Sequence, residues 1–184
     1  KSHYFSGLSF NSLDVKKNNI FFAIKGTKIN GNKFIKKAIK KGAKTVVSSL
    51  SFQGLKNQVL YIRAKNSRKV LAEVASKLYK NKPNNIIAVT GTNGKSSIVD
   101  FYFQILKLNK KKVASIGTLG VKTHKRKIKI NNTTLDPISL NNFLQKIKQM
   151  NINNVILEAS SHGLKQNRLD GIDFKTGVFT NLSH

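Results

Sequence analysis

Residues 85–97 constrain the fold of this chain more than any other stretch. They begin with 86–89, a short, β-branched, uncharged run that is typical of a strand buried on both faces of a parallel sheet. A loop bounded by Gly91 and Gly94 follows, and apolar residues then recur at helical spacing from 96 to 108. A strand, a glycine loop and a helix in this order predict a phosphate-binding turn.

The residues of this turn suit phosphate chemistry. Glycines let backbone N–H groups converge on an anion, and the start of a helix adds partial positive charge. Lys95 is expected to reach the β- and γ-phosphates, and Ser96 to hold Mg²⁺. The full G-x-x-x-x-G-K-[ST] pattern is not met, because Val89 stands five residues before Gly94. A chance glycine turn is the competing interpretation. The predicted nucleotide-binding residues are Gly91, Thr92, Asn93, Gly94, Lys95, Ser96 and Ser97.

Charge narrows the class of ligand. The net charge is +27, from 34 Lys and Arg against 7 Asp and Glu. The basic residues are nearly all lysines and are spread over every predicted element, as in proteins from AT-rich genomes, whereas nucleic-acid binders cluster them on one face. We therefore expect no nucleic-acid partner. The excess positive charge still favours phosphate-bearing ligands through electrostatic steering.

Other absences limit the location and chemistry of the chain. It has no cysteine, which excludes disulfides and thiol catalysis. It has no apolar stretch of membrane-spanning length and no signal-peptide pattern, so we expect a cytoplasmic protein without a membrane partner. The sequence starts at Lys1 without an initiator methionine, from which we expect a fragment or a processed chain.

Hydrophobic patterning predicts two α/β domains, 1–83 and 84–184. In the first, short strands are expected within 8–24 and at 45–47 and 60–62. One helix is expected around 34–39, with Gly42 as its stop, and another after Ser67 as its cap. A linker containing Pro83 follows. In the second, strands at 86–89, 113–116 and 154–158 alternate with helices at 96–108 and 137–150, and residues 121–130 form a hairpin. This order predicts a doubly wound parallel sheet with ligands beyond the carboxyl ends of the strands.

Four motifs in order carry a family resemblance. They are Thr-Gly-Thr-Asn-Gly-Lys-Ser-Ser at 90–97, Asn-Thr-Thr at 132–134, Glu-Ala-Ser-Ser-His-Gly-Leu at 158–164 and Phe-Thr-Asn-Leu at 179–182. Together with Gln166 and Arg168 they resemble the Mur ligases, and within them the members that add the third peptide residue to the peptidoglycan precursor. Residues 11–35 are similar to the N-terminal UDP-binding domain of these enzymes, except that Asn11 and Leu13 flank Ser12 where Asp and Arg are usual. Leu135 also replaces a common proline.

The resemblance implies a small UDP-binding domain, then the first part of a P-loop ATPase domain. It implies that ATP and Mg²⁺ activate the carboxyl terminus of UDP-N-acetylmuramoyl-L-alanyl-D-glutamate as an acyl phosphate. A diamino acid, meso-diaminopimelate or L-lysine, then attacks. Lys95 and Glu158 are the implied catalytic residues, and Ser96 and Glu158 the implied metal ligands. The implied substrate residues are Ser12 and Thr27 at the uridine end, and Asn132, Thr133, Thr134, Ser160, Gln166 and Arg168 at the muramoyl dipeptide.

In this family the Phe-Thr-Asn-Leu segment leads into an Asp-His pair whose histidine is a metal ligand, then a carbamoylated lysine and a C-terminal domain. The sequence stops at His184, before such a pair. We therefore expect an N-terminal fragment that is inactive alone. A monomer is expected as well.

Other interpretations remain open at this stage. The chain as a whole could be a P-loop binding module without ligase chemistry, a nucleic-acid binder, or a sister ligase acting on D-alanyl-D-alanine or folylpolyglutamate. Among single residues, Glu158 could be a solvated carboxylate, Thr133 and Thr134 could cap the next helix, and Arg168 could pair with Asp170. His162 is assigned no proton-transfer role, because it can simply hydrogen-bond its own turn.

Overall fold

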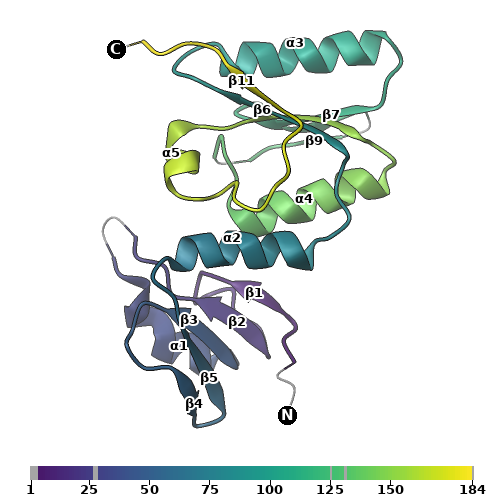
Figure 1. Cartoon of the computed structure of the whole chain (residues 1–184). Coiled ribbons are helices and arrows are strands. Elements are labelled where there is room, and N and C mark those ends of the chain that lie inside the picture. Colours follow the sequence, from purple (N-terminus) through teal and green to yellow (C-terminus); the bar gives the residue numbers. More distant parts are fainter. Residues whose placement is uncertain (1–3, 27–28, 125, 131, 184) are drawn as a thin grey trace. The chain divides into compact units, whose positions relative to one another are not determined.

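The computed structural model describes residues 4–26, 29–124, 126–130 and 132–183. The chain forms two compact units, Lys1–Leu71 and Ala72–His184, and helix α2 (Ser67–Leu78) runs through the division (Figure 1). The predicted domain boundary after residue 83 stays a prediction. Ser67 is the first residue of α2 and not its cap. The Asn66 side chain takes that role, because its Oδ1 accepts from the backbone N–H groups of Arg68 and Lys69, both at 3.1 Å.

The first unit is a small α/β unit, as predicted. Among the described residues of this unit, four parallel strands and one antiparallel edge strand lie in the order β1-β2-β3-β5-β4. The edge strand β4 was not predicted, because Gly-Leu-Lys shows no alternation. The 3₁₀ turn η1 (Gly31–Phe34) leads into helix α1 (Ile35–Lys40). The strands are β1 (Gly7–Ser9), β2 (Asn19–Phe22), β3 (Thr45–Ser48), β4 (Gly54–Lys56) and β5 (Val59–Arg63).

Helix α1 packs on the sheet of the first unit and ends just before Gly42. Ile35 and Ala38 pack with Phe21 and Val46 of the sheet. Gly42 then adopts a φ of +107°, and a side chain there would stand 2.9 Å from the Cα of Lys17. The predicted helix stop at Gly42 is therefore confirmed, and it rests on both backbone conformation and space.

The second unit contains the predicted doubly wound sheet. Its strands lie in the order β11-β6-β10-β7-β8-β9, and the first four are parallel. The predicted hairpin is confirmed as β8 and β9, which pair antiparallel to each other, and β8 also pairs antiparallel with β7. The strand β11 was not predicted. The bounds are β6 (Asn85–Thr90), β7 (Val113–Gly117), β8 (Gly120–Thr123), β9 (Lys127–Ile128), β10 (Asn154–Glu158) and β11 (Thr176–Phe179).

Helices cover both faces of this sheet. Along β10, Ile156 packs on the side of helix α3 (Lys95–Leu108), while Val155 and Leu157 join the core formed with helix α4 (Pro137–Gln149). This alternation follows from the two-residue period of a strand. Figure 1 shows α3 and α4 on opposite sides of the strands. Within the described residues, no helix combines the length and apolar character needed to cross a membrane.

Helix α4 begins as its sequence suggests, with Pro137 at its first position. Its cap is Asp136, whose Oδ1 accepts from the backbone N–H groups of Ile138 and Ser139, both at 3.0 Å. The interpretation of Thr133 and Thr134 as caps of this helix is therefore wrong. Both threonines are left for other contacts near the end of β10.

Candidate active site

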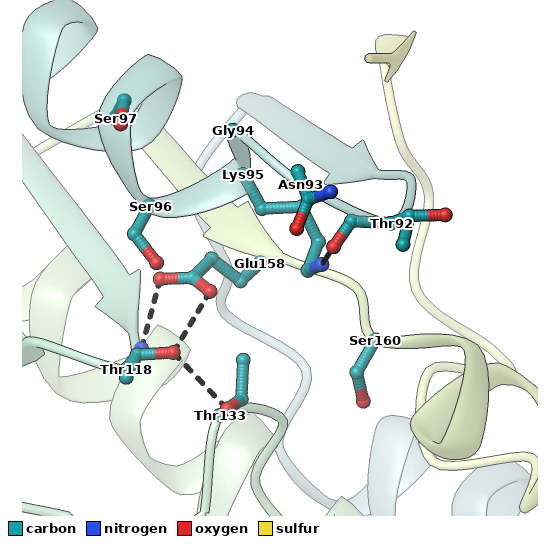
Figure 2. Close-up of a pocket in the computed structure, with 10 residues that line it drawn as sticks. All are labelled: Thr92, Asn93, Gly94, Lys95, Ser96, Ser97, Thr118, Thr133, Glu158 and Ser160. Carbon is teal, nitrogen blue, oxygen red and sulfur yellow. Dashed lines mark hydrogen bonds between the residues drawn. The ribbon is translucent and has the colours of Figure 1, made fainter. Parts of the chain in front are cut away.

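A pocket of about 370 Å³ lies in the second unit, where β6, β7 and β10 end. This is the edge of a parallel sheet at which ligands bind. Figure 2 shows side chains from the glycine loop, Thr118, Thr133 and the end of β10 around one space. The pocket is lined by Thr92, Asn93, Gly94, Lys95, Ser96, Ser97, Thr118, Thr133, Glu158 and Ser160.

The glycine loop takes the shape that its two glycines permit. Gly91 has a φ of +133° and Gly94 a φ of +81°, and α3 starts directly after Gly94. No side chain caps this helix. Its first backbone N–H groups are therefore available to an anion in the pocket, together with the positive end of the helix dipole.

The segment 180–183 holds the glycine loop through hydrogen bonds to Thr92 and Asn93. The backbone N–H of Thr92 donates to the carbonyl of Asn181 at 2.9 Å, and that of Asn93 to Asn181 Oδ1 at 3.0 Å. Thr180 Oγ1 donates to the carbonyl of Asn93 at 2.6 Å. This segment contains part of the Phe-Thr-Asn-Leu motif, and no role in the site was predicted for it. Since the two loop amides are already used, a phosphate must find its amide donors further along, from Gly94 onward.

Lys95 lies inside its own loop. Its Nζ donates to the carbonyl of Gly91 at 2.6 Å and to that of Thr92 at 2.8 Å. An ammonium group carries three N–H donors, so one remains for a ligand. The lysine thus braces the loop and also brings a positive charge to the pocket.

Glu158 ends β10 and is the only carboxylate among the residues lining the pocket. It is 2% exposed, so the solvated interpretation is wrong. Its Oε1 accepts from the backbone N–H of Thr118 at 2.8 Å and its Oε2 from Thr118 Oγ1 at 3.0 Å. Thr118 follows the end of β7, the strand beside β10. The sequence did not single it out: its place after a strand end was a signal, but other polar residues share that signal.

The oxygen atoms of Glu158 and Ser96 are suitable ligands for Mg²⁺. An ionised carboxylate offers about four lone-pair positions, and Thr118 occupies two. The Ser96 hydroxyl points toward the Glu158 carboxylate (Figure 2). Mg²⁺ prefers such oxygen ligands and usually keeps several waters and phosphate oxygens. Among the described residues no group of three or more acidic, histidine or cysteine side chains gathers. The protein ligands of a cation here would be Glu158 and Ser96.

The two threonines, Thr133 and Thr134, have different surroundings. Thr133 lines the pocket, with its Oγ1 3.0 Å from Thr118 Oγ1. Thr134 is buried, and its Oγ1 donates to the carbonyl of Glu158 at 3.2 Å and accepts from the backbone N–H of Ser160 at 3.0 Å. Ser160 lines the pocket and caps helix α5 (Ser161–Lys165). Thr134 therefore supports the turn that carries Ser160.

Arg168 also supports this turn. Its Nη1 donates to the carbonyl of Thr134 at 2.5 Å, and its Nε and Nη2 donate to Gln166 Oε1. The Asp170 carboxylate instead accepts from Asn167 at 3.0 Å, so the surface pair of Arg168 with Asp170 is not formed. Gln166 Nε2 donates to His162 Nε2 at 2.6 Å, since its oxygen is taken by Arg168. His162 thus bonds its own turn.

Some predicted residues do not reach the pocket. Asn132 is exposed and does not line the pocket. Thr134, which is buried, and Gln166 and Arg168, which are partly exposed, do not line it either. Ser12 is buried in the first unit, where Asn11 Oδ1 accepts from the backbone N–H of Leu13 at 3.0 Å. That turn can equally be made by the more usual aspartate. Thr27 lies outside the described residues.

The doubly wound sheet and its phosphate loop define a nucleotide-binding α/β protein of the P-loop class. Comparison with known families is more specific: the Mur ligase middle domain matches residues 89–184, and the Mur ligase family catalytic domain matches residues 4–79. This chain belongs to the Mur ligase family.

Individual relatives agree with this assignment. The UDP-N-acetylmuramoyl-L-alanyl-D-glutamate–2,6-diaminopimelate ligase of Rickettsia montanensis is 42% identical over all of this chain, and that of Bradyrhizobium diazoefficiens is 39% identical over 97% of it. A solved structure of a ligase with the same name superposes with a TM-score of 0.82 at 32% identity, covering 98% of this chain and 37% of that one. The chain spans 39% and 36% of the length of the two relatives.

A more distant structure shows the shared fold alone. MurF ligase from Thermotoga maritima, solved in complex with ADP, superposes with a TM-score of 0.62 at 20% identity. The superposition covers 95% of this chain and 37% of the MurF chain.

Proposed function

We propose that this chain supplies the nucleotide pocket of an ATP-dependent ligase that adds a diamino acid to UDP-N-acetylmuramoyl-L-alanyl-D-glutamate. The observation that carries the proposal is the buried Glu158 carboxylate, toward which the Ser96 hydroxyl points. The phosphate loop and Thr133 line the same pocket. The names of the relatives support diaminopimelate as the diamino acid. L-lysine is the alternative.

The proposed chemistry has two steps. The D-glutamyl carboxylate attacks the γ-phosphorus of ATP, the bond from that phosphorus to the β,γ-bridging oxygen breaks, and ADP leaves. The amine then attacks the acyl carbon of the acyl phosphate, the carbon–oxygen bond to the phosphoryl group breaks, and inorganic phosphate leaves. The amine loses a proton in forming the amide.

The chain's own residues bind and orient the reactants. The first amides of α3 and the remaining N–H of Lys95 hold the transferring phosphoryl group, where fixed donors stabilise developing negative charge. Mg²⁺, bound by Glu158 and Ser96, would neutralise charge between the phosphate and the approaching carboxylate. Thr133 and Ser160 contact the dipeptide end of the substrate from the other side of the pocket.

The remaining assignments belong to the same proposal. Thr134, Gln166 and Arg168 act on the muramoyl dipeptide through the turn that they support, and Asn132 contacts it from the loop before α4. Ser12 and Thr27 act at the uridine end, within a UDP-binding domain of residues 1–83 followed by an ATP-binding domain from residue 84. The protein works as a cytoplasmic monomer, without a nucleic-acid or membrane partner.

A ligation assay tests the proposal. The complete protein that contains this sequence is given ATP, Mg²⁺ and UDP-N-acetylmuramoyl-L-alanyl-D-glutamate, with meso-diaminopimelate and L-lysine in parallel reactions. We expect a tripeptide product in at least one, and none from the Lys95→Ala variant. Nucleotide binding without product from either amine would favour the module without ligase chemistry. Product only with D-alanyl-D-alanine or glutamate as the acceptor would favour a sister ligase.

A further inference from the structure

We propose that Thr118 is a positioning residue for Glu158. It holds both carboxylate oxygens on one side, so that their remaining lone pairs are directed at Ser96 and the pocket. The inference rests on the proposed function for its link to ligation. Its structural part stands on the contacts of Thr118 alone.

The first observation is the number of contacts. Thr118 binds Glu158 twice, through its backbone N–H to Oε1 at 2.8 Å and through its hydroxyl to Oε2 at 3.0 Å. Two bonds from one residue fix the rotation of a carboxylate, which a single bond leaves free. No other side chain among the described residues makes a hydrogen bond to this carboxylate.

The second observation is the direction of the hydroxyl bonds. An ionised carboxylate only accepts, so the single hydroxyl proton of Thr118 is committed to Glu158. The bond of 3.0 Å between Thr118 Oγ1 and Thr133 Oγ1 must then be donated by Thr133. The result is an ordered chain from Thr133 through Thr118 to Glu158, drawn by the dashed lines of Figure 2. Bonds to a charged acceptor are also stronger than neutral ones.

The third observation is exposure. Glu158 is 2% exposed, whereas Thr118 is exposed at the rim of the pocket. Replacing Thr118 therefore disturbs little packing, and its effect should be seen in function more than in stability. Residues that orient a metal ligand in this way typically change metal affinity or activity when they are removed.

The test compares three variants of the complete protein. Thr118→Val removes the hydroxyl and keeps the backbone N–H and the approximate size, and Thr118→Ser restores the hydroxyl. Thr176→Val, at an exposed threonine of β11 away from the pocket, is the matched control. Binding of Mn²⁺ in the presence of ADP is followed by electron paramagnetic resonance. The kcat of ligation and the KM for ATP are measured separately.

We expect Thr118→Val to weaken Mn²⁺ binding and to lower kcat, each by roughly 10- to 100-fold. The KM for ATP should change little, because the phosphate loop is intact. Mn²⁺ affinity and kcat of Thr118→Ser should stay within about 3-fold of the wild-type values, and those of Thr176→Val should equal the wild-type values. Neither variant loses a contact to Glu158.

The inference would be overturned by an unchanged Mn²⁺ affinity in Thr118→Val, or by a Thr118→Ser variant as impaired as Thr118→Val. The latter would show that the methyl group, and not the hydroxyl, matters. If the wild-type protein ligates neither amine, the proposed function fails, and the Mn²⁺ titration alone decides the role of Thr118. A wild-type protein that binds no Mn²⁺ with ADP would contradict the positioning role itself.

Discussion

The Glu158 side chain lies against the Cα of Gly117, so closely that a β-carbon added to Gly117 would stand 2.6 Å from both Cγ and Cδ of Glu158. Gly117→Ala should therefore displace the carboxylate. A displacement near 1 Å in an active site can cost about 100-fold in rate, and we expect a loss of that order in kcat. The control is Gly177→Ala in β11, where an added β-carbon meets nothing within 4 Å. Equal kcat values for the two variants would contradict this account.

Gly91 should tolerate no side chain. Its φ of +133° is a conformation that residues with a β-carbon rarely adopt, and that carbon would stand 2.9 Å from the carbonyl oxygen of Asn181. We expect Gly91→Ala to lose about 1–3 kcal/mol of unfolding free energy, measured in urea, and to weaken ADP binding. Gly94→Ala, whose β-carbon meets open space, should lose less stability. The opposite order would show that the segment 180–183 does not hold the loop.

The ion pair between Asp100 and Lys122 predicts a pH dependence of stability. Their Oδ1 and Nζ lie 2.6 Å apart and join α3 to β8. The hydrogen bond from Lys122 is the main cause that lowers the pKa of Asp100 below its usual 3.8. A carboxyl group whose pKa is lowered by folding stabilises the folded state at pH values above its pKa in the unfolded chain. This stabilisation is lost as the pH falls through the pKa of the folded state.

The matched variant is Asp100→Asn. At pH 7 we expect it to be less stable than the wild type by up to about 1 kcal/mol, because the pair is partly exposed. The difference should shrink as the pH falls below 3.8. Urea unfolding at a series of pH values measures it. A difference that grows toward acid pH would mean that another group is responsible.

The cap of α4 gives a prediction about stability alone. Asp136→Ala leaves the backbone N–H groups of Ile138 and Ser139 without their side-chain acceptor. We expect a loss of about 1 kcal/mol in unfolding free energy, and little loss in Asp136→Asn, since asparagine caps helices equally well. Thermal unfolding compares the two. An unchanged unfolding free energy in Asp136→Ala would show that Asp136 is not the cap of α4.

Sequence alone predicted the elements that have a strong period or strong end signals. The strand at 86–89, the helix that follows the loop and the proline-started helix α4 are examples, because burial and capping there depend on local residue types. Local signals failed where pairing is set by distant residues. The strand β11 exists because it pairs with β6, from which it is separated by about ninety residues in the chain. The strand β4 pairs with its neighbour β5 and was missed for another reason, because its three residues show no alternation.

In the candidate site, too, some residues could be predicted from the sequence and others could not. The glycine loop and Glu158 could be found from motif and position, and the pocket does bring them together. Thr118 could not be ranked above other threonines, because its role depends on β7 lying beside β10. The cap of α2 was missed by one residue, since Asn66 and Ser67 are both good caps and their sequence does not choose between them.

The most direct test of the central claim is the fate of the carboxylate oxygens. UDP-N-acetylmuramoyl-L-alanyl-D-glutamate labelled with ¹⁸O in both oxygens of the reacting D-glutamyl carboxylate is ligated by the complete protein, and the released phosphate is analysed by mass spectrometry. If ATP activates this carboxylate as an acyl phosphate, each phosphate released carries one ¹⁸O and the amide keeps the other. Phosphate without label, formed while tripeptide accumulates, would contradict carboxylate activation in this pocket.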